Sequence, residues 1–407
     1  MPDAVIVATA RSPIGRARKG SLRSIRADDL AVQMVNVALG KVPQLDPTDI
    51  DDLMLGCGLP GGEQGWNMAR NVAVLAGYDH LPGATITRYC SSSLQTSRMA
   101  FHAISAGEGD VFISAGVESV SHYAKGTSDH IPGQTITNPW FDAAVARSNE
   151  RLADADAWRD PRERDDLPDV YLAMGQTAEN VQQVIGMSRQ EQDAFAVRSQ
   201  QLAVAAIDSG FWAAEIDSVK LVDGTVVAAD DGPRRGTTLD SVGQLPPVFR
   251  PDGTVTAGNS CPLNDGAAAL IIMSDEKARD LDLTPLARIV STGLSALSPE
   301  IMGLGPVEAS RRALARAGMT IDDVGLVEIN EAFAVQALGS AQQLGVPPEK
   351  LNVNGGAIAI GHPFGMTGAR TTVTLMNALR QRDETVGLQS MCVGGGMGMA
   401  MIIERLA

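Results

Sequence analysis

Cys90 stands at a place in this sequence where a nucleophile could act. It lies between an apolar strand candidate, residues 84–87, and a helix that begins at Ser91–Ser93. The free N–H groups of a helix N-terminus favour a thiolate and can hold the oxyanion that forms when sulfur attacks a carbonyl. The local sequence therefore predicts either a catalytic cysteine or a packed structural thiol, and it leaves both open.

His362 and Cys392 both lie beside glycine-rich turns. The segment 361–368 holds His362 between glycines and a proline, which predicts an exposed turn before a helix. Cys392 ends the strand candidate 387–391 and precedes Gly394–Gly396, whose bare N–H groups suit an anion nest. Each side chain is either part of a reactive site or an ordinary residue beside a tight turn.

Two further polar residues are candidates for binding. Asn330 follows the strand candidate 325–329, where its amide would either orient a water molecule or cap the next helix. Arg234 stands beside Arg235, between a proline and a glycine, and is either plain surface charge or a contact for an anion.

The composition limits the class of protein. The 407 residues are 44% hydrophobic, which predicts a globular chain of two or three packed units. A net charge of −15 argues against nucleic acid as a partner. Four widely spaced cysteines predict neither a disulfide framework nor a metal site. Since we find no signal peptide and no apolar run of about 18–20 residues, we expect a cytoplasmic protein that does not enter a membrane.

The elements that would position these side chains alternate between strand and helix. This alternation fills residues 1–119 and returns after residue 256, which predicts a mainly parallel sheet covered on both faces. Between them, residues 120–255 read as an inserted region with much surface loop and amphipathic helices over 174–185 and 188–209.

The two α/β stretches resemble each other. Thr48–Leu53 is similar to Thr320–Val324, about 270 residues later, and the glycines after two apolar strands recur in nearly the same register. Such a duplication predicts two pseudo-symmetric halves whose equivalent loops meet at a shared centre. We therefore expect one site built from the loops near residues 90, 330, 362 and 392.

The ordered set of motifs resembles the thiolase family, which includes acetyl-CoA C-acetyltransferases and 3-ketoacyl-CoA thiolases. The matching elements cover essentially the whole chain: Cys90–Ser92, Thr256–Asn259, Asn264–Ala268, Asn330–Phe333, Asn352–Ala359, Gly361–Pro363 and Cys392–Gly396. Any one of them is weak, but together and in this order they are highly specific.

The resemblance implies a fold and a domain organisation. It implies an α/β protein with the thiolase fold, in which two duplicated βαβαβαββ-type halves form a layered αβαβα core with an inserted loop domain. Residues 1–119 would be the first part of the N-terminal half, 120–255 the loop domain and 256–407 the C-terminal half. Within the last range, residues 256–275 would complete the N-terminal half.

The resemblance also implies roles for the site residues. Cys90 would take the acyl group as a thioester, and His362 would favour its thiolate and, with a water held by Asn330, polarise the thioester oxygen. Cys392 would be the second acid/base. The N–H groups of Cys90 and Gly394 would form an oxyanion hole.

The implied substrates are acyl-CoA and coenzyme A, with no permanently bound cofactor and no metal. Met174 begins a family motif, Cys261 stands where a hydroxyl often contacts pantetheine, Met302 matches an acyl-pocket methionine, and Arg234 matches an arginine near the CoA adenine. Many biosynthetic members have a histidine where Ala173 stands here. Family members are usually homotetramers or homodimers, and their reaction has a place in fatty acid metabolism such as β-oxidation.

Three functions are therefore weighed. The leading hypothesis is a thiolase that condenses two acyl-CoA molecules to 3-ketoacyl-CoA or runs the reverse thiolysis. A ketoacyl synthase-like condensing enzyme would share the fold but would need a second polar pair in place of Cys392–Gly396. A non-catalytic lipid or acyl-CoA binding protein would have no need of both cysteines and His362.

Overall fold

Strands from both ends of the chain join in one mixed sheet. The computed structural model describes residues 2–123, 137–151 and 157–407. In that part of the chain the strand order is β10-β11-β12-β9-β1-β8-β5-β3-β4, with β2 beside β8. Only two residue pairs, between β1 and β9, connect the two ends of this sheet.

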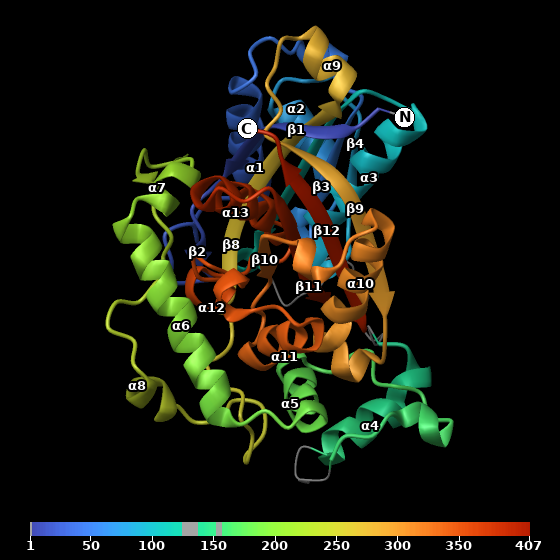
Figure 1. Cartoon of the computed structure of the whole chain (residues 1–407), viewed down its shortest axis with the longest axis vertical. Helices are drawn as coiled ribbons and strands as arrows, with labels where there is room; N and C mark the ends of the chain where they lie inside the picture. The colour runs from blue at the N-terminus through green and yellow to red at the C-terminus, as the bar shows by residue number, and fades with distance from the viewer. Residues whose placement is uncertain (1, 124–136, 152–156) are drawn as a thin grey trace.

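The N-terminal half contributes one end of the sheet and the helices around it (Figure 1). Its elements are β1 (Ala4–Arg11), β2 (Gly15–Arg16), α1 (Ala27–Gly40), β3 (Asp52–Gly56), α2 (Met68–Leu75), β4 (Gly83–Ile86), α3 (Ser92–Ala106), β5 (Val111–Ser119) and β8 (Asn264–Ser274). The C-terminal half follows α9 (Asp275–Asp280) and contains β9 (Ala287–Ala296), α10 (Gly305–Ala317), β10 (Leu326–Ile329), α11 (Ala334–Leu344), α12 (Ala357–Ile360), α13 (Thr367–Arg382), β11 (Val386–Val393) and β12 (Met397–Arg405).

The two halves repeat one arrangement. The order β1-β8-β5-β3 in the first half matches β9-β12-β11-β10 in the second. Where β4 pairs with β3, Leu351 forms a parallel bridge to Val327 of β10. The start of α13 at Thr367 lies 275 residues after the start of α3 at Ser92. The duplication predicted from short sequence similarities is therefore present in the fold.

The sheet is mixed, so the prediction of a mainly parallel sheet is wrong. Only β3 with β4, β3 with β5, and β10 with β11 run parallel, while β8 runs antiparallel to both β1 and β5. One cause is the turn between β11 and β12, because three glycines are too short a connection for a parallel crossover. The alternation of helices and strands in the sequence does not reveal that β12 runs antiparallel to β11.

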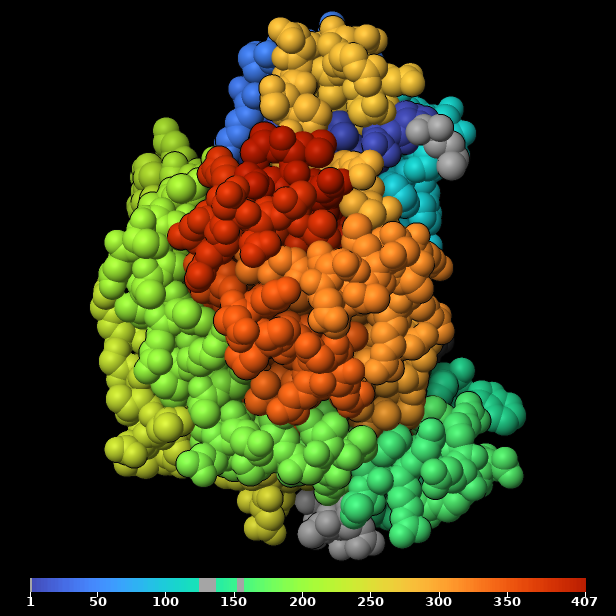
Figure 2. Space-filling view, viewed as in Figure 1, coloured from blue at the N-terminus to red at the C-terminus, as the bar shows by residue number. Residues whose placement is uncertain are grey.

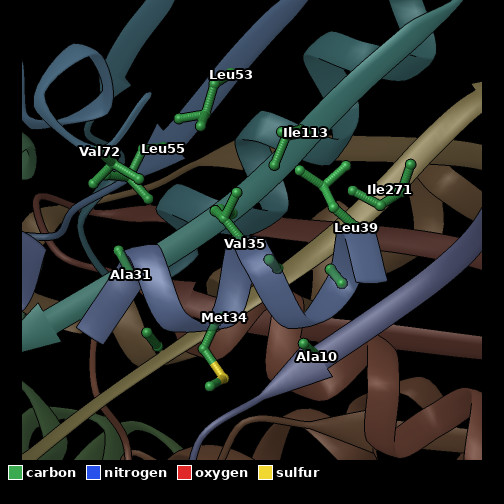
Figure 3. Close-up of a cluster of buried hydrophobic side chains, with 14 of the residues drawn as sticks. Ala10, Ala31, Met34, Val35, Leu39, Leu53, Leu55, Val72, Ile113 and Ile271 are labelled. Atoms are coloured by element: carbon green, nitrogen blue, oxygen red, sulfur yellow. The ribbon is translucent and has the colours of Figure 1, made fainter. Parts of the chain in front are cut away.

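One part of the hydrophobic core fills the space between α1 and the sheet. Figure 3 shows Met34, Val35 and Leu39 of α1 together with Leu53, Ile113 and other strand residues. Every residue of β5 and β8 is buried, because α1 packs on these strands from one side and α3 and α13 from the other. Burying each large aliphatic side chain contributes about 1.5–3 kcal/mol relative to exposure.

The layers position the loops that carry the site. Helices α3 and α13 pack against each other between the two ends of the sheet, which completes the αβαβα layering. The N-terminus of α13 lies against that of α3, since the amide N–H of Ala369 donates to Ser93 Oγ at 2.8 Å. The segments just before the two helices, which contain Cys90 and His362, therefore lie close to each other.

The inserted region flanks the C-terminal half. Its elements are α4 (Asp142–Glu150), α5 (Met174–Ile185), α6 (Arg189–Asp208), α7 (Phe211–Glu215), β6 (Val219–Lys220), β7 (Val226–Val227) and α8 (Leu239–Gly243). Both predicted amphipathic helices are present as α5 and α6, and they pack on α11 and α12. Figure 2 shows these helices (green) along the margin of the C-terminal half (orange). The domain boundaries at residues 119 and 255 remain predictions.

No helix within the described ranges combines the length and apolar character that a membrane crossing requires.

Candidate active site

Cys90 sits in a strained turn beside a cavity. It belongs to the 3-10 turn η3 (Tyr89–Ser91), and Tyr89 has a φ of +45°, a left-handed conformation that costs about 1–3 kcal/mol for such a residue. The hydroxyl of Ser92 donates to the carbonyl of Tyr89 at 2.6 Å and accepts from the N–H of Arg88 at 2.9 Å. These bonds hold the turn and present the half-buried sulfur at the wall of a cavity.

This space, the Cys90 cavity, has a volume of about 230 Å³. Its walls come from both halves and from the inserted region: Gly58, Leu59, Tyr89, Cys90, Val170, Tyr171, Leu172, Met174, Phe364, Gly394 and Gly395. The structure thus places Met174 and Gly394 in the same cavity wall as Cys90.

Two backbone N–H groups surround the Cys90 sulfur. Those of Gly394 and of Cys90 itself form hydrogen bonds that favour the thiolate. Burial, with a smaller contribution from the charge of Glu118, nevertheless raises the pKa of the Cys90 thiol to about 12. The N–H groups therefore favour the thiolate, as the sequence indicates, but desolvation opposes and outweighs them.

His362 is buried, not exposed as its glycine-rich surroundings predict. Only 1% of the residue is accessible, and burial lowers the pKa of the ring to about 3, with a smaller contribution from the charge of Arg370. Nδ1 lies 2.7 Å from Thr367 Oγ1, whose hydroxyl donates to the carbonyl of Pro363. The hydroxyl oxygen then accepts from Nδ1–H, so the neutral ring keeps its lone pair on Nε2.

Asn330 contacts this ring and does not cap a helix. Its Nδ2 lies 3.2 Å from His362 Nε2, whereas α11 begins only at Ala334. The other side-chain atom, Oδ1, is buried and has no hydrogen-bond partner among the described residues. Asn330 Oδ1 can therefore accept a hydrogen bond from a small polar group, such as a water molecule, next to His362 Nε2.

Cys392 completes a group of three sulfurs. It lies within β11, which ends at Val393, two residues beyond the predicted strand end at 391, and it is fully buried. Burial raises the pKa of its thiol, and so do the charges of Cys90 and Cys261. Cys392 and Met302 belong to one apolar cluster, against which Cys261 packs. The 3-10 turn that holds Cys90 packs against β11.

Arg234 lies away from Cys90, in a second cavity of about 290 Å³ that we call the arginine cavity. Arg16 and Arg235 line it as well, and burial and the charge of Arg16 lower the pKa of Arg234. An anion bound there would relieve this repulsion. The loop 260–262 connects the two sites, because Ser260 and Pro262 line the arginine cavity while Cys261 interacts with Cys90.

Sequence reasoning missed several residues that shape this site. Thr367 fixes the ring of His362, Asn264 accepts from the His362 amide at 3.0 Å, and Phe364 packs its ring edge-on against the imidazole. Glu118 is buried beside Cys90 at the end of β5. A carboxylate inside an otherwise apolar strand is a signal that could have identified it. Among the described residues, no group of three or more His, Cys, Asp or Glu could hold a metal ion.

Comparisons with known proteins identify the family. Residues 4–276 match the thiolase N-terminal domain, and residues 283–405 match the thiolase C-terminal domain. The 3-ketoacyl-CoA thiolases of Bacillus subtilis and Shewanella frigidimarina are 43% and 42% identical to this chain, and each match covers 99% or more of both proteins.

Solved structures show the same relationship. The acetyl-CoA acetyltransferase of Bacillus anthracis matches with a TM-score of 0.84 at 37% identity, over 100% of this chain and 99% of that one. The dimeric peroxisomal thiolase of Saccharomyces cerevisiae matches with a TM-score of 0.88 at 33% identity, over 99% and 98%. The chain therefore belongs to the thiolase family, and its fold is the thiolase fold.

Proposed function

We propose that this thiolase is a 3-ketoacyl-CoA thiolase that accepts acyl chains longer than that of acetoacetyl-CoA. The apolar Cys90 cavity is the observation that carries this proposal. The names of the two bacterial relatives reported above support it, and the activity would suit the β-oxidation of fatty acids.

The size and lining of the cavity favour a longer chain. At about 30 Å³ for each liquid-like group, 230 Å³ has room for about eight non-hydrogen atoms, far more than an acetyl group needs. Leu59, Tyr171 and Phe364 provide apolar walls, and Leu59 and Tyr171 are 42% and 44% exposed. The cavity therefore opens to the surface, where the end of a longer chain can emerge.

In the proposed acylation, Cys90 attacks the thioester carbonyl of the acyl-CoA. Its proton passes to His362 Nε2, which carries the lone pair of the ring and releases the N–H of Asn330 to take it. The negative charge on the carbonyl oxygen faces the N–H groups of Cys90 and Gly394. The carbon–sulfur bond to CoA then breaks, CoA leaves as a thiol with the proton from His362, and the acyl group remains on Cys90.

In condensation, Cys392 removes the α-proton of a second acyl-CoA, and the carbanion attacks the Cys90 thioester. A water held by Asn330 stabilises the enolate oxygen, and His362 does so when its Nε2 carries a proton. In thiolysis the same steps run backwards, with Cys392 returning the proton. The burial that raises the pKa of Cys392 keeps it protonated, as the cleavage direction requires.

We propose that coenzyme A spans the two cavities. The phosphates and adenine would lie near Arg16 and Arg234, and the pantetheine would follow the loop 260–262 towards Cys90. Cys261 would contact the pantetheine, and Met302, in the cluster with Cys392, would border the reacting acyl group. CoA is substrate and product here, not a bound cofactor.

A homo-oligomer is also proposed. The last strand in the sheet order, β4, is an edge strand, and the nearby Trp66 is 91% exposed. Pairing β4 with its copy would satisfy the edge and cover Trp66. We propose a homodimer on this basis, supported by the dimeric neighbour from yeast, and light scattering on the purified protein would distinguish it from a tetramer.

Thiolysis of 3-ketoacyl-CoA substrates of increasing length tests the proposal. Each added methylene in the cavity should increase kcat/KM about fourfold, from about 0.8 kcal/mol per buried methylene, until the cavity is full. Leu59→Trp should remove this gain and leave the four-carbon substrate little affected. Leu239→Trp is the control, because Leu239 has similar exposure, 45%, outside the cavity. Highest activity on the four-carbon substrate would instead indicate an acetoacetyl-CoA thiolase, and no thiolysis would refute the proposal.

A further inference from the structure

The Glu118 side chain is the most heavily bonded carboxylate near the site. It is fully buried and lies at the end of β5. Oε1 accepts from Tyr123 Oη at 2.5 Å, Gln64 Nε2 at 3.1 Å and the Leu59 N–H at 3.3 Å. Oε2 accepts from the N–H groups of Gly58 at 2.7 Å and Gly365 at 2.8 Å. Burial raises the pKa of Glu118, whereas every one of these groups donates to its oxygens and favours the anion.

These bonds connect the two halves at the site. Gly58 and Leu59 follow β3 in the N-terminal half and line the Cys90 cavity. Gly365 belongs to the C-terminal half and lies three residues after His362. One carboxylate therefore holds a wall of the cavity and the loop of the histidine together.

The Gly365 loop is pressed against the N-terminal half. A side chain at this position would lie 2.2 Å from the carbonyl oxygen of Val117 and 2.7 Å from that of Gly56, so only glycine allows this approach. Glu118, next to Val117 in β5, bonds the N–H of the same glycine. The contact is close and leaves the His362 loop little freedom to shift.

We propose that Glu118 is a positioning residue: it locks the loop of His362 against the loop after Cys57, and so sets the geometry in which Cys90 passes its proton to His362. The inference rests on the proposed acyl transfer through Cys90. Glu118 does not touch the arginine cavity, so its effect is confined to the reacting end of the substrate.

Glu118→Gln is the direct test, because an amide keeps the shape but offers only one accepting oxygen. Its NH₂ group must face at least one backbone N–H that now has no acceptor. We expect kcat to fall about 10- to 100-fold, the usual cost of losing a group that orients a catalytic side chain, with the KM for CoA within about twofold. We also expect the pH profile of Cys90 alkylation by iodoacetamide to shift to lower pH, because a negative charge near the thiol is removed.

Glu179→Gln is the matched control. Glu179 is also buried, at 2% exposure, and accepts from the N–H groups of Thr254 and Val255 away from both cavities. It should lower the Tm comparably and leave kcat and the alkylation profile unchanged. A folded Glu118→Gln enzyme with wild-type kcat would overturn the proposal, and so would an equal loss of kcat in the control.

A second variant, Tyr123→Phe, and the activity of the wild-type enzyme complete the test. If Glu118→Gln does not fold, Tyr123→Phe removes one donor to the carboxylate, and kcat should fall up to about fivefold, the value of one hydrogen bond. An unchanged kcat in that variant would then overturn the proposal. A wild-type enzyme without thiolase activity would refute the proposed function instead, so the two failures are distinguishable.

Discussion

Thr367→Val should disable the base without touching substrate. The wild-type hydroxyl accepts from His362 Nδ1–H and donates to the carbonyl of Pro363, which leaves on Nε2 the lone pair that accepts from Asn330 and, in the proposed reaction, takes the proton of Cys90. Valine has nearly the same shape and no acceptor. A neutral imidazole in the variant then favours the other tautomer, with its proton on Nε2, and this form cannot act as a base towards the thiol.

The size of the effect follows from the burial of the ring. A buried N–H without an acceptor costs about 1–3 kcal/mol, which reduces the population of the Nδ1–H tautomer about 5- to 150-fold. Because His362 is 1% exposed, water does not replace the lost acceptor. We therefore expect the rate of Cys90 acylation to fall by about the same factor.

The assay is the burst of CoA released when acyl-CoA acylates the enzyme, measured by stopped flow. Thr371→Val is the control, because Thr371 is one turn further along α13, equally buried, and donates to Gln389, not to His362. Ring ¹⁵N shifts of labelled histidine report the tautomer directly. An acylation rate in Thr367→Val within twofold of wild type, or an equal loss in Thr371→Val, would show that the hydroxyl does not control the base.

Three further results are expected. Cys90→Ala should abolish both condensation and thiolysis, whereas Cys392→Ala should retain acylation and lose proton transfer at the α-carbon, and trapping of labelled acyl-enzyme distinguishes them. Arg234→Ala should raise the KM for CoA about tenfold, the value of one charge-assisted hydrogen bond, with kcat unchanged in steady-state assays. Because burial lowers the pKa of His362 from 6.5 to about 3, the unfolded chain binds the extra proton below pH 6.5. The free energy of unfolding should then fall by about 2 kcal/mol between pH 7 and pH 5, and urea titrations should show a smaller change in His362→Asn.

The sequence was informative where local patterns decide structure. Apolar periodicity is enough to place α5 and α6, and α6 begins with a capping box between Ser188 and Glu191. The same holds for the buried strand over 111–114, which extends to Ser119. The ordered motifs also place the Cys90, Asn330, His362 and Cys392 segments at one centre, as found.

What the sequence could not supply depends on packing between distant segments. His362 is buried because its loop is pressed into the other half of the protein, and no local pattern reports that contact. The raised pKa of the Cys90 thiol has the same origin, since a helix N-terminus is visible in sequence whereas desolvation is not. The sequence indicates the role of Glu118 only weakly. It does not indicate that of Thr367, because threonine is common at the start of a helix.

The repeated arrangement of the two halves has an evolutionary consequence. Cys90 precedes α3 and His362 precedes α13, so the proposed acyl acceptor and its proposed proton acceptor occupy corresponding loops of the two repeats. An ancestor assembled from two identical repeats would have carried the same side chain at both places. Fusion into one polypeptide allowed the copies to diverge, and the unequal pair at the centre of this molecule records that loss of symmetry.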